Sequence, residues 1–410
     1  MTGWDDRARG CAVRLVKILS WLVGLLVALA LLGIVVAWVW ARPDAVGDFL
    51  ENAAVPQGAA AGDLIAVEPY SLDVPDGAEA WRIIYVTTRE HGDLAPASAV
   101  VMTPVDAIGP LPMVSWAHGT TGVVAGCAPS VFAPFANVPG VPKLLDAGWA
   151  YVATDYVGLG TEGGHAYLVG RESAQGVLDA VRAAVDMDAV DLLPETVVWG
   201  HSQGGGVALW AGLIAPDYAP EITVAGVAGL APASDLPALV ETARSGLFGK
   251  IVSSYLMASY SQTYPEIDRS AYVGGLAGVL ASDIAGRCVG GRETLFSVAE
   301  TMLLPAGGIF QSDPKEGALG ARLADNVPLG AYAMPVLVAQ GDEDDLVLEP
   351  VQAGFVAQLC ADGQDVDYLT FAGRDHVSLV APDSPLIGPL MDWTAARFAG
   401  SPAEGCAFND

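Results

Sequence analysis

One short stretch of this sequence has the residue types and spacing that nucleophilic catalysis needs. Residues 200–204 read Gly-His-Ser-Gln-Gly, which places Ser202 between two glycines. An apolar run at 196–199 precedes it, and small residues lead into a helical pattern at 207–214. A G-x-S-x-G pattern on a sharp strand-to-helix turn exposes a serine hydroxyl, because bulky neighbours would clash there. We therefore predict that Ser202 is a nucleophile. The alternative is a glycine-rich turn with an incidental serine.

A serine hydroxyl is a weak nucleophile until a neighbouring base takes its proton. His376 is the only histidine that follows Ser202 in the chain, and it comes just after the apolar run at 366–371. In folds with this turn the histidine is the last catalytic residue in chain order. Its position therefore predicts His376 as the base, with an ordinary surface or core histidine as the alternative.

The acid that orients the base should follow the apolar run at 335–339. Four carboxylates compete in the next residues, which read Gln-Gly-Asp-Glu-Asp-Asp at 340–345. The pattern Gly-x-x-Asp followed by apolar residues selects Asp344, and Asp342 and Asp345 remain alternatives. A calcium loop is another interpretation, but the spacing lacks the EF-hand pattern.

Acyl transfer also needs two main-chain N–H groups that stabilise the developing oxyanion. One is expected from Gln203, the residue after the nucleophile. The other is expected from the loop at 118–122, which reads His-Gly-Thr-Thr-Gly. We favour Thr120 as this donor, with Gly119 next, and we interpret His118 as a residue that shapes the loop.

The elements that must position these residues are short apolar runs that alternate with helical patterns. One such helix is predicted from the apolar stripe over residues 177–185. Strands that alternate with helices predict a mostly parallel sheet covered on both faces, with the site beyond the carboxyl ends of the strands. We predict strands at 81–88, 99–103, 113–116, 151–154, 196–199, 223–227, 335–339 and 366–371.

Residues from about 235 to 330 interrupt this alternation. They have no clear strand pattern, and they contain scattered large apolar residues. We predict a helical cap that lies over the strand ends and shapes an apolar pocket. The alternative is a peripheral helical layer with a core of its own.

The N-terminal residues differ from the rest of the chain. Residues 18–40 are uncharged and long enough to cross a hydrocarbon core of about 30 Å. The basic residues before this run are Arg7, Arg9, Arg14 and Lys17. The positive-inside rule then places residues 1–17 in the cytoplasm. We predict a transmembrane signal-anchor at 18–40, a linker at 41–62 and an extracytoplasmic domain at 63–410. A cleaved signal peptide, and hence secretion, is the alternative.

Charge and cysteine content limit the partners and the compartment. The net charge of −28 disfavours nucleic acid as a partner. Cys11 precedes the apolar run, and four cysteines follow it: Cys127, Cys288, Cys360 and Cys406. An even number in an oxidising compartment predicts two disulfides, for which three pairings are possible. No cysteine or histidine spacing is typical of a zinc site, so no structural metal is expected.

Several motifs together resemble the secretory lipase family of the lipase A type. They are Trp-Ala-His-Gly-Thr-Thr-Gly at 116–122, Cys-Ala-Pro-Ser at 127–130, Asp-Tyr-Val-Gly-Leu-Gly-Thr at 155–161, Tyr-Leu-Val-Gly at 167–170 and Gly-His-Ser-Gln-Gly-Gly at 200–205. The resemblance covers about residues 65 to 410. It implies an α/β-hydrolase fold with a helical lid, and hydrolysis of acylglycerols and other carboxylic esters without a cofactor. It also implies that Ser202, Asp344 and His376 form the triad.

The same resemblance implies that Cys127 pairs with Cys288 and that Cys360 pairs with Cys406. The predicted function is therefore a lipase or carboxylesterase that acts on lipidic esters through an acyl-enzyme. A cell-surface acyltransferase with the same triad is one alternative. A catalytically inactive binding protein on this fold is the other.

Overall fold

The computed structural model describes residues 3–402 and 405–409, and it divides into two compact units, residues 1–42 and 43–410. The first unit contains helix α1 (Gly3–Trp40), in which Val16–Trp40 is exposed and apolar enough to cross a membrane. Its 25 residues would rise about 37 Å. A signal sequence near the N-terminus can meet the same criteria of length and composition. Of the predicted cytoplasmic segment 1–17, residues 1–2 lie outside the described residues.

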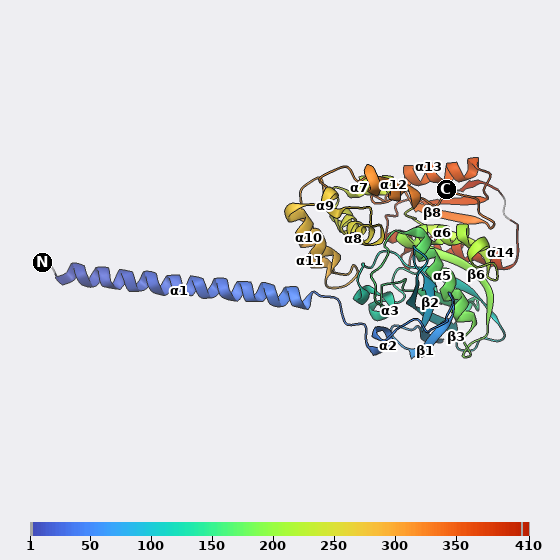
Figure 1. Ribbon diagram of the computed structural model, residues 1–410, viewed down its shortest axis with the longest axis horizontal. Helices are drawn as coiled ribbons and strands as arrows, with labels where there is room; N and C mark the ends of the chain where they lie inside the picture. Colours follow the sequence, from blue (N-terminus) through green and yellow to red (C-terminus); the bar gives the residue numbers. More distant parts are fainter. Residues whose placement is uncertain (1–2, 403–404, 410) are drawn as a thin grey trace. The chain divides into compact units, whose positions relative to one another are not determined.

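The second unit is built on one mixed sheet, mostly parallel, as predicted (Figure 1). In the described part of the chain it has ten strands in the order β1-β2-β3-β5-β4-β6-β7-β8-β9-β10. The pairings from β1 through β3 to β5 are antiparallel, and all the others are parallel. The strands are β1 (Leu64–Tyr70), β2 (Ala78–Thr88), β3 (Leu94–Pro104), β4 (Leu111–Ala117), β5 (Ala150–Thr154), β6 (Leu192–His201), β7 (Thr223–Leu230), β8 (Val336–Gly341), β9 (Val366–Phe371) and β10 (Ala407–Asn409).

Helices cover both faces of this sheet because its central strands are apolar on both sides. Val198 belongs to one core cluster, with residues of α5, α6 and α13, whereas Val197 and Trp199 belong to the cluster that contains residues of α4 and α14. This alternation follows from the two-residue period of a strand. The helices of these layers are α4 (Val141–Asp146), α5 (Gly170–Val185), α6 (Gln203–Tyr218), α13 (Glu349–Ala361) and α14 (Ile387–Phe398), with the short elements η1 (Ala125–Cys127), α3 (Pro129–Phe132) and η2 (Ser378–Val380).

The segment between β7 and β8 is helical throughout its regular structure and has a core of its own. Tyr255, Leu256 and Tyr260 are fully buried in that core. Figure 1 shows its middle helices grouped beyond one end of the sheet, at the left. The helices are α7 (Leu236–Ala243), α8 (Leu247–Thr263), α9 (Arg269–Tyr272), α10 (Gly275–Ala285), α11 (Thr294–Thr301) and α12 (Gly317–Asp325).

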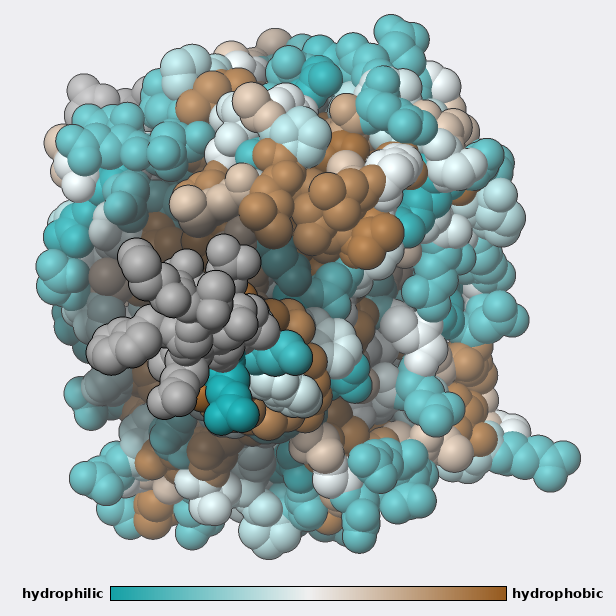
Figure 2. All heavy atoms as spheres, turned by 90° about the vertical axis from the view of Figure 1, so that its left-hand side faces the viewer, coloured by the Kyte–Doolittle hydropathy of each residue, from teal (hydrophilic) through white to brown (hydrophobic). Residues whose placement is uncertain are grey.

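The face of the molecule that carries α10 and α11 has a group of hydrophobic side chains (Figure 2). The large hydrophobic residues of this region that are more than two-thirds exposed are Leu276, Leu295, Met302 and Leu303. Isolated exposed apolar residues are normal on soluble proteins, but a contiguous group marks a surface that contacts something apolar.

Residues 43–62, part of the predicted linker 41–62, contact the rest of the second unit. The segment contains helix α2 (Asp48–Glu51), and Leu50 is only 1% exposed. Leu50 reaches Gly160, where an added Cβ would lie 3.2 Å from the leucine Cδ1. Asp44 also forms an ion pair of 2.7 Å with Arg292. The segment therefore packs against the rest of the second unit through Leu50 and Asp44.

The burial of Leu50 predicts a stability effect far from the catalytic candidates. Leu50→Ala should destabilise the fold by about 2–5 kcal/mol, because it removes buried methyl groups and leaves a cavity. The midpoint of thermal unfolding of the full chain in detergent measures this. The exposed Leu72 provides the matched control, since Leu72→Ala should change the stability by less than about 0.5 kcal/mol. Equal shifts for the two variants would show that the segment is not packed.

Candidate active site

Ser202 occupies a tight turn between β6 and α6. Its backbone has φ 58° and ψ −119°, a conformation that non-glycine residues rarely adopt. The two flanking glycines make the turn possible. A Cβ added to Gly200 would lie 2.0 Å from the Gly204 carbonyl oxygen, and one added to Gly204 would lie 1.9 Å from that of Ala117. Neither contact leaves room for a side chain. The turn at Ser202 therefore requires glycine at positions 200 and 204.

The three residues predicted as a triad lie together. The Ser202 Oγ is 2.8 Å from the His376 Nε2, and the His376 Nδ1 is 2.7 Å from the Asp344 Oδ2. Ser202 follows β6, Asp344 follows β8 and His376 follows β9, so parallel strands bring all three to one edge of the sheet. A hydroxyl, an imidazole and a carboxylate in this order can activate the hydroxyl for attack on a carbonyl carbon.

Among the four competing carboxylates, the structure brings Asp344 alone to His376. Asp344 is buried, whereas Asp342 and Asp345 are exposed, and Asp342 accepts a hydrogen bond from the Gly373 N–H instead. Among the described residues, no group of three or more His, Cys, Asp or Glu side chains is arranged to hold a metal ion.

The surroundings of Asp344 favour its charged form. Burial by itself would raise its pKa, but His376 and the main-chain N–H groups of Val347 and Leu346 lower it below the ordinary value. The side-chain amide of Gln340 donates a further hydrogen bond of 3.0 Å. Gln340 is fully buried at the end of β8. It is a supporting residue that the sequence analysis did not identify.

The groups predicted to stabilise an oxyanion lie on either side of Ser202. Gln203 is the first residue of α6, so its N–H has no partner within the helix, and the Ser202 side chain does not cap the helix. Gly119 and Thr120 both line the cavity that contains Ser202. The Thr120 hydroxyl forms a hydrogen bond of 2.7 Å with that of Tyr167, which fixes the side chain of this loop residue.

The cavity at Ser202 has a volume of about 190 Å³. Its walls come from the loop at 118–121, from residues 129–137 and from the helical insertion. The insertion contributes Phe248, Val289 and Gly290. The wall is mainly apolar, so the cavity suits an apolar group attached to a polar reacting centre.

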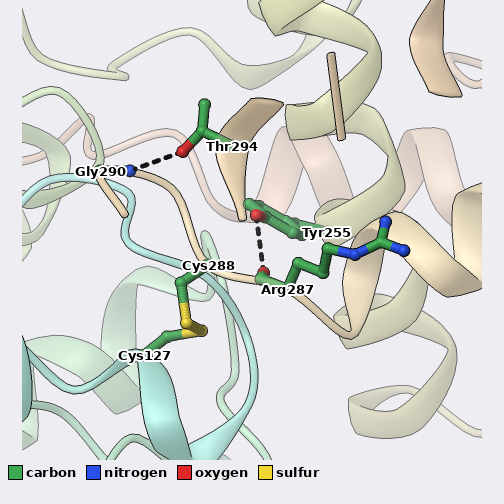
Figure 3. The surroundings of a disulfide bond; sticks show 6 residues. All are labelled: Cys127, Tyr255, Arg287, Cys288, Gly290 and Thr294. Atoms are coloured by element: carbon green, nitrogen blue, oxygen red, sulfur yellow. Dashed lines mark hydrogen bonds between the residues drawn. A yellow bond between two sulfur atoms is a disulfide. The ribbon is translucent and has the colours of Figure 1, made fainter. Parts of the chain in front are cut away.

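A disulfide connects two walls of this cavity (Figure 3). It joins Cys127, just beyond the proposed oxyanion loop, to Cys288 in the insertion. Next to it, the Val289 N–H donates a hydrogen bond of 2.7 Å to the Thr121 carbonyl. The Tyr255 hydroxyl donates to the Arg287 carbonyl at 2.9 Å. The second disulfide, Cys360–Cys406, lies elsewhere in the fold. Both pairings agree with those that the family resemblance implies.

His201 also supports the site, although the sequence analysis assigned it no role. It is 4% exposed, and its Nε2–H donates a hydrogen bond of 2.8 Å to the main-chain carbonyl of His376. Burial lowers the pKa of His201 to about 3, so it remains neutral and cannot replace His376 as the base. The sequence feature that could have identified His201 is its position directly before Ser202 in the Gly-His-Ser-Gln-Gly motif.

Comparisons with known proteins agree with this fold. The family model described as "Secretory lipase" matches residues 136–405. A Mycobacterium tuberculosis protein named "Probable inactive lipase" is 27% identical over 357 residues, which cover 80% of this chain and 76% of that protein. A Malassezia globosa secreted triacylglycerol lipase is also 27% identical over 357 residues, 80% of this chain and 75% of its own length.

The fold is also similar to a solved structure. The closed state of Candida antarctica lipase A superimposes with a TM-score of 0.70 at 18% identity, over 85% of this chain and 84% of that chain. At this identity the likeness concerns the α/β-hydrolase fold.

The choice of Asp344 over its neighbours can be tested by a matched pair of variants. Asp344→Asn should lower kcat for an activated ester by about 10⁴-fold, because the amide favours the wrong tautomer of the histidine. Asp345→Asn should leave kcat close to the wild-type value, since the Asp345 side chain is exposed. Steady-state kinetics with p-nitrophenyl esters would measure kcat for both variants and for the wild type. The assignment of Asp344 is wrong if Asp345→Asn has the larger effect.

The lowered pKa values predict that three groups of the site do not change their charge near neutral pH. A carboxyl group stays ionised, and a histidine stays neutral, above its own pKa. Asp344 and His201 therefore keep one charge state above about pH 5, and so does the buried His118, whose pKa burial lowers to about 4. None of these three groups should therefore add a step to the profile of kcat/KM against pH between about pH 5 and pH 8. His201→Gln should keep the shape of that profile, and a changed shape would contradict this.

Proposed function

Because the chain belongs to the secretory lipase family, we propose that it hydrolyses lipidic carboxylic esters through Ser202, His376 and Asp344. The observation that carries this proposal is the continuous hydrogen-bonded series from the Ser202 hydroxyl through His376 to the buried Asp344, at 2.8 and 2.7 Å. The apolar cavity beside Ser202 supports a substrate with an apolar substituent.

The proposed reaction is a two-step acyl transfer. The Ser202 Oγ attacks the ester carbonyl carbon while its proton passes to the His376 Nε2. The N–H groups of Gln203 and Thr120, or of Gly119 in place of Thr120, stabilise the oxyanion. The C–O bond to the alcohol breaks, and His376 returns the proton to the departing alcohol. Water then loses a proton to His376 and attacks the acyl carbon. The bond from that carbon to the Ser202 Oγ breaks, the acid leaves, and His376 returns the proton to the Ser202 Oγ.

Two alternatives share this fold. The name of the Mycobacterium tuberculosis relative raises the possibility of an inactive protein, but the hydrogen-bonded Ser202, His376 and Asp344 favour activity here. An acyltransferase would follow the same first step and pass the acyl group to an alcohol instead of water. Product analysis in the presence of a competing alcohol separates hydrolysis from transfer.

The N-terminal helix concerns the compartment in which this reaction takes place. We propose that residues 18–40 anchor the chain, with residues 1–17 in the cytoplasm and the hydrolase domain outside. The disulfides support an oxidising location for the domain.

We also propose that the helical insertion at about 235–330 is the cap of the active site, since Phe248, Val289 and Gly290 line the cavity.

The proposed function predicts that Ser202→Ala abolishes ester hydrolysis and labelling by a fluorophosphonate probe. The variant removes the only atom that forms the acyl-enzyme, and its smaller side chain should leave the unfolding midpoint almost unchanged. Rates with p-nitrophenyl esters of increasing chain length measure both activity and preference. Hydrolysis retained by Ser202→Ala would overturn the assignment. Absence of labelling in the wild type would favour an inactive protein.

A further inference from the structure

One buried histidine of the site has no part in the proposed reaction. His165 is 3% exposed and lies in the loop between β5 and α5. Within the described part of the chain, the residues that line the substrate cavity include Ser202 and His376 but not His165. Its Nε2 is 2.8 Å from the side-chain Nε2 of Gln203, the residue that follows the nucleophile.

The hydrogen bonds of His165 assign a role to each of its nitrogens. Its Nδ1 is 3.3 Å from the Val157 carbonyl, which can only accept, so the Nδ1 carries the hydrogen. The Nε2 of a neutral imidazole then accepts, and the Gln203 amide donates to it. Burial lowers the pKa of His165 to about 3, which keeps the ring in this neutral, accepting form.

The same ring also contacts residues that hold the second oxyanion loop. His165 stacks on Tyr156, with ring centroids 5.3 Å apart and planes 7° apart, and its edge meets Tyr167. The Tyr156 hydroxyl donates to the His118 carbonyl at 3.1 Å. The Tyr167 hydroxyl shares a hydrogen bond with Thr120. His165 therefore lies behind both main-chain segments that are proposed to hold the oxyanion.

The backbone of Tyr156, on which His165 stacks, is strained. Tyr156 has φ 65°, a conformation that costs a bulky residue about 1–3 kcal/mol and that persists where surrounding contacts maintain it. Tyr156 presents its ring to His165 and its hydroxyl to the His118 carbonyl, just before Gly119. Strain of this kind clusters at functional sites, where it is part of how groups are held in place.

We propose that His165 is a positioning residue that orients Gln203 and the loop at 118–120, so that their N–H groups converge on one oxyanion. This inference rests on the proposed function. Oxyanion donors act on the transition state more than on the bound substrate. Loss of the His165–Gln203 hydrogen bond should therefore lower kcat and leave KM nearly unchanged.

The test compares His165→Phe with His165→Gln in the full chain. Phenylalanine keeps a ring for Tyr156 to stack on but cannot accept a hydrogen bond. It should lower kcat by about 10- to 100-fold, since small misplacements of catalytic groups have effects of this size. Glutamine can accept the same bond through its Oε1 and should restore most of the loss. The shape of the profile of kcat/KM against pH should be unchanged in both variants, because His165 is neutral above about pH 5.

Gln203→Leu removes the same hydrogen bond from the other side and should cause a similar loss of kcat. If His165→Phe does not fold, Gln203→Leu still tests whether the His165–Gln203 hydrogen bond contributes to kcat. The double variant should lose little more than either single one, because the two residues share one interaction. The inference is overturned if His165→Phe or Gln203→Leu keeps the wild-type kcat, if KM rises instead, or if His165→Gln gives no recovery in folded protein. Fluorophosphonate labelling of the wild type and its loss in Ser202→Ala test the proposed function separately.

Discussion

The left-handed backbone of Ser202 is maintained by the ends of two neighbouring strands, β7 and β4. The Ser202 N–H donates to the Leu230 carbonyl at the end of β7, and the Ser202 carbonyl accepts from the Ala233 N–H. At the other side, the missing side chain of Gly204 lets the Ala117 carbonyl at the end of β4 approach. A conformation that costs about 1–3 kcal/mol is stable only because the sheet supplies these contacts. The serine hydroxyl and the first N–H of α6 are held together at one end of the cavity as a result.

Burial separates the histidines of the site into two kinds. His118, His165 and His201 have pKa values lowered to about 3 or 4, so they act as neutral hydrogen-bonding groups of fixed orientation. His376 is the one that contacts both Ser202 and Asp344. His118 and His201 form hydrogen bonds with main-chain carbonyls, whereas His165 accepts from the Gln203 amide. A charge on His165 would replace that acceptor with a donor and break its bond to Gln203.

The helical insertion has its own core, yet it is joined to the catalytic domain where the cavity is formed. The Cys127–Cys288 disulfide and the hydrogen bond from Val289 to Thr121 hold residues 288–290 against the oxyanion loop. This part of the cavity wall is therefore fixed, whereas Phe248 on α8 is partly exposed and carries no such link. Any change in the width of the cavity should involve the side of Phe248 more than the side of the disulfide.

Local sequence patterns were sufficient for much of the fold and of the candidate site. Every predicted strand overlaps an observed one, because short apolar runs bounded by turn residues are typical of buried strands. The sequence by itself also determined Ser202 and His376 as candidates, since the glycine pattern of the elbow is local and one histidine follows it. The strands β1 and β10 were missed, because edge strands are short or partly exposed and have weak patterns.

Contacts between residues that lie far apart in the chain became known only from the tertiary structure. Asp344 was separated from Asp342 and Asp345 by burial and direction, which a run of acidic residues does not reveal. The attachment of residues 43–62, the contact of Gln340 with Asp344 and the convergence of His165, Tyr156 and Gln203 likewise arise from long-range packing. A sequence pattern shows which side chains a segment contains. Which group meets which partner is determined only when the sheet brings the strand ends together.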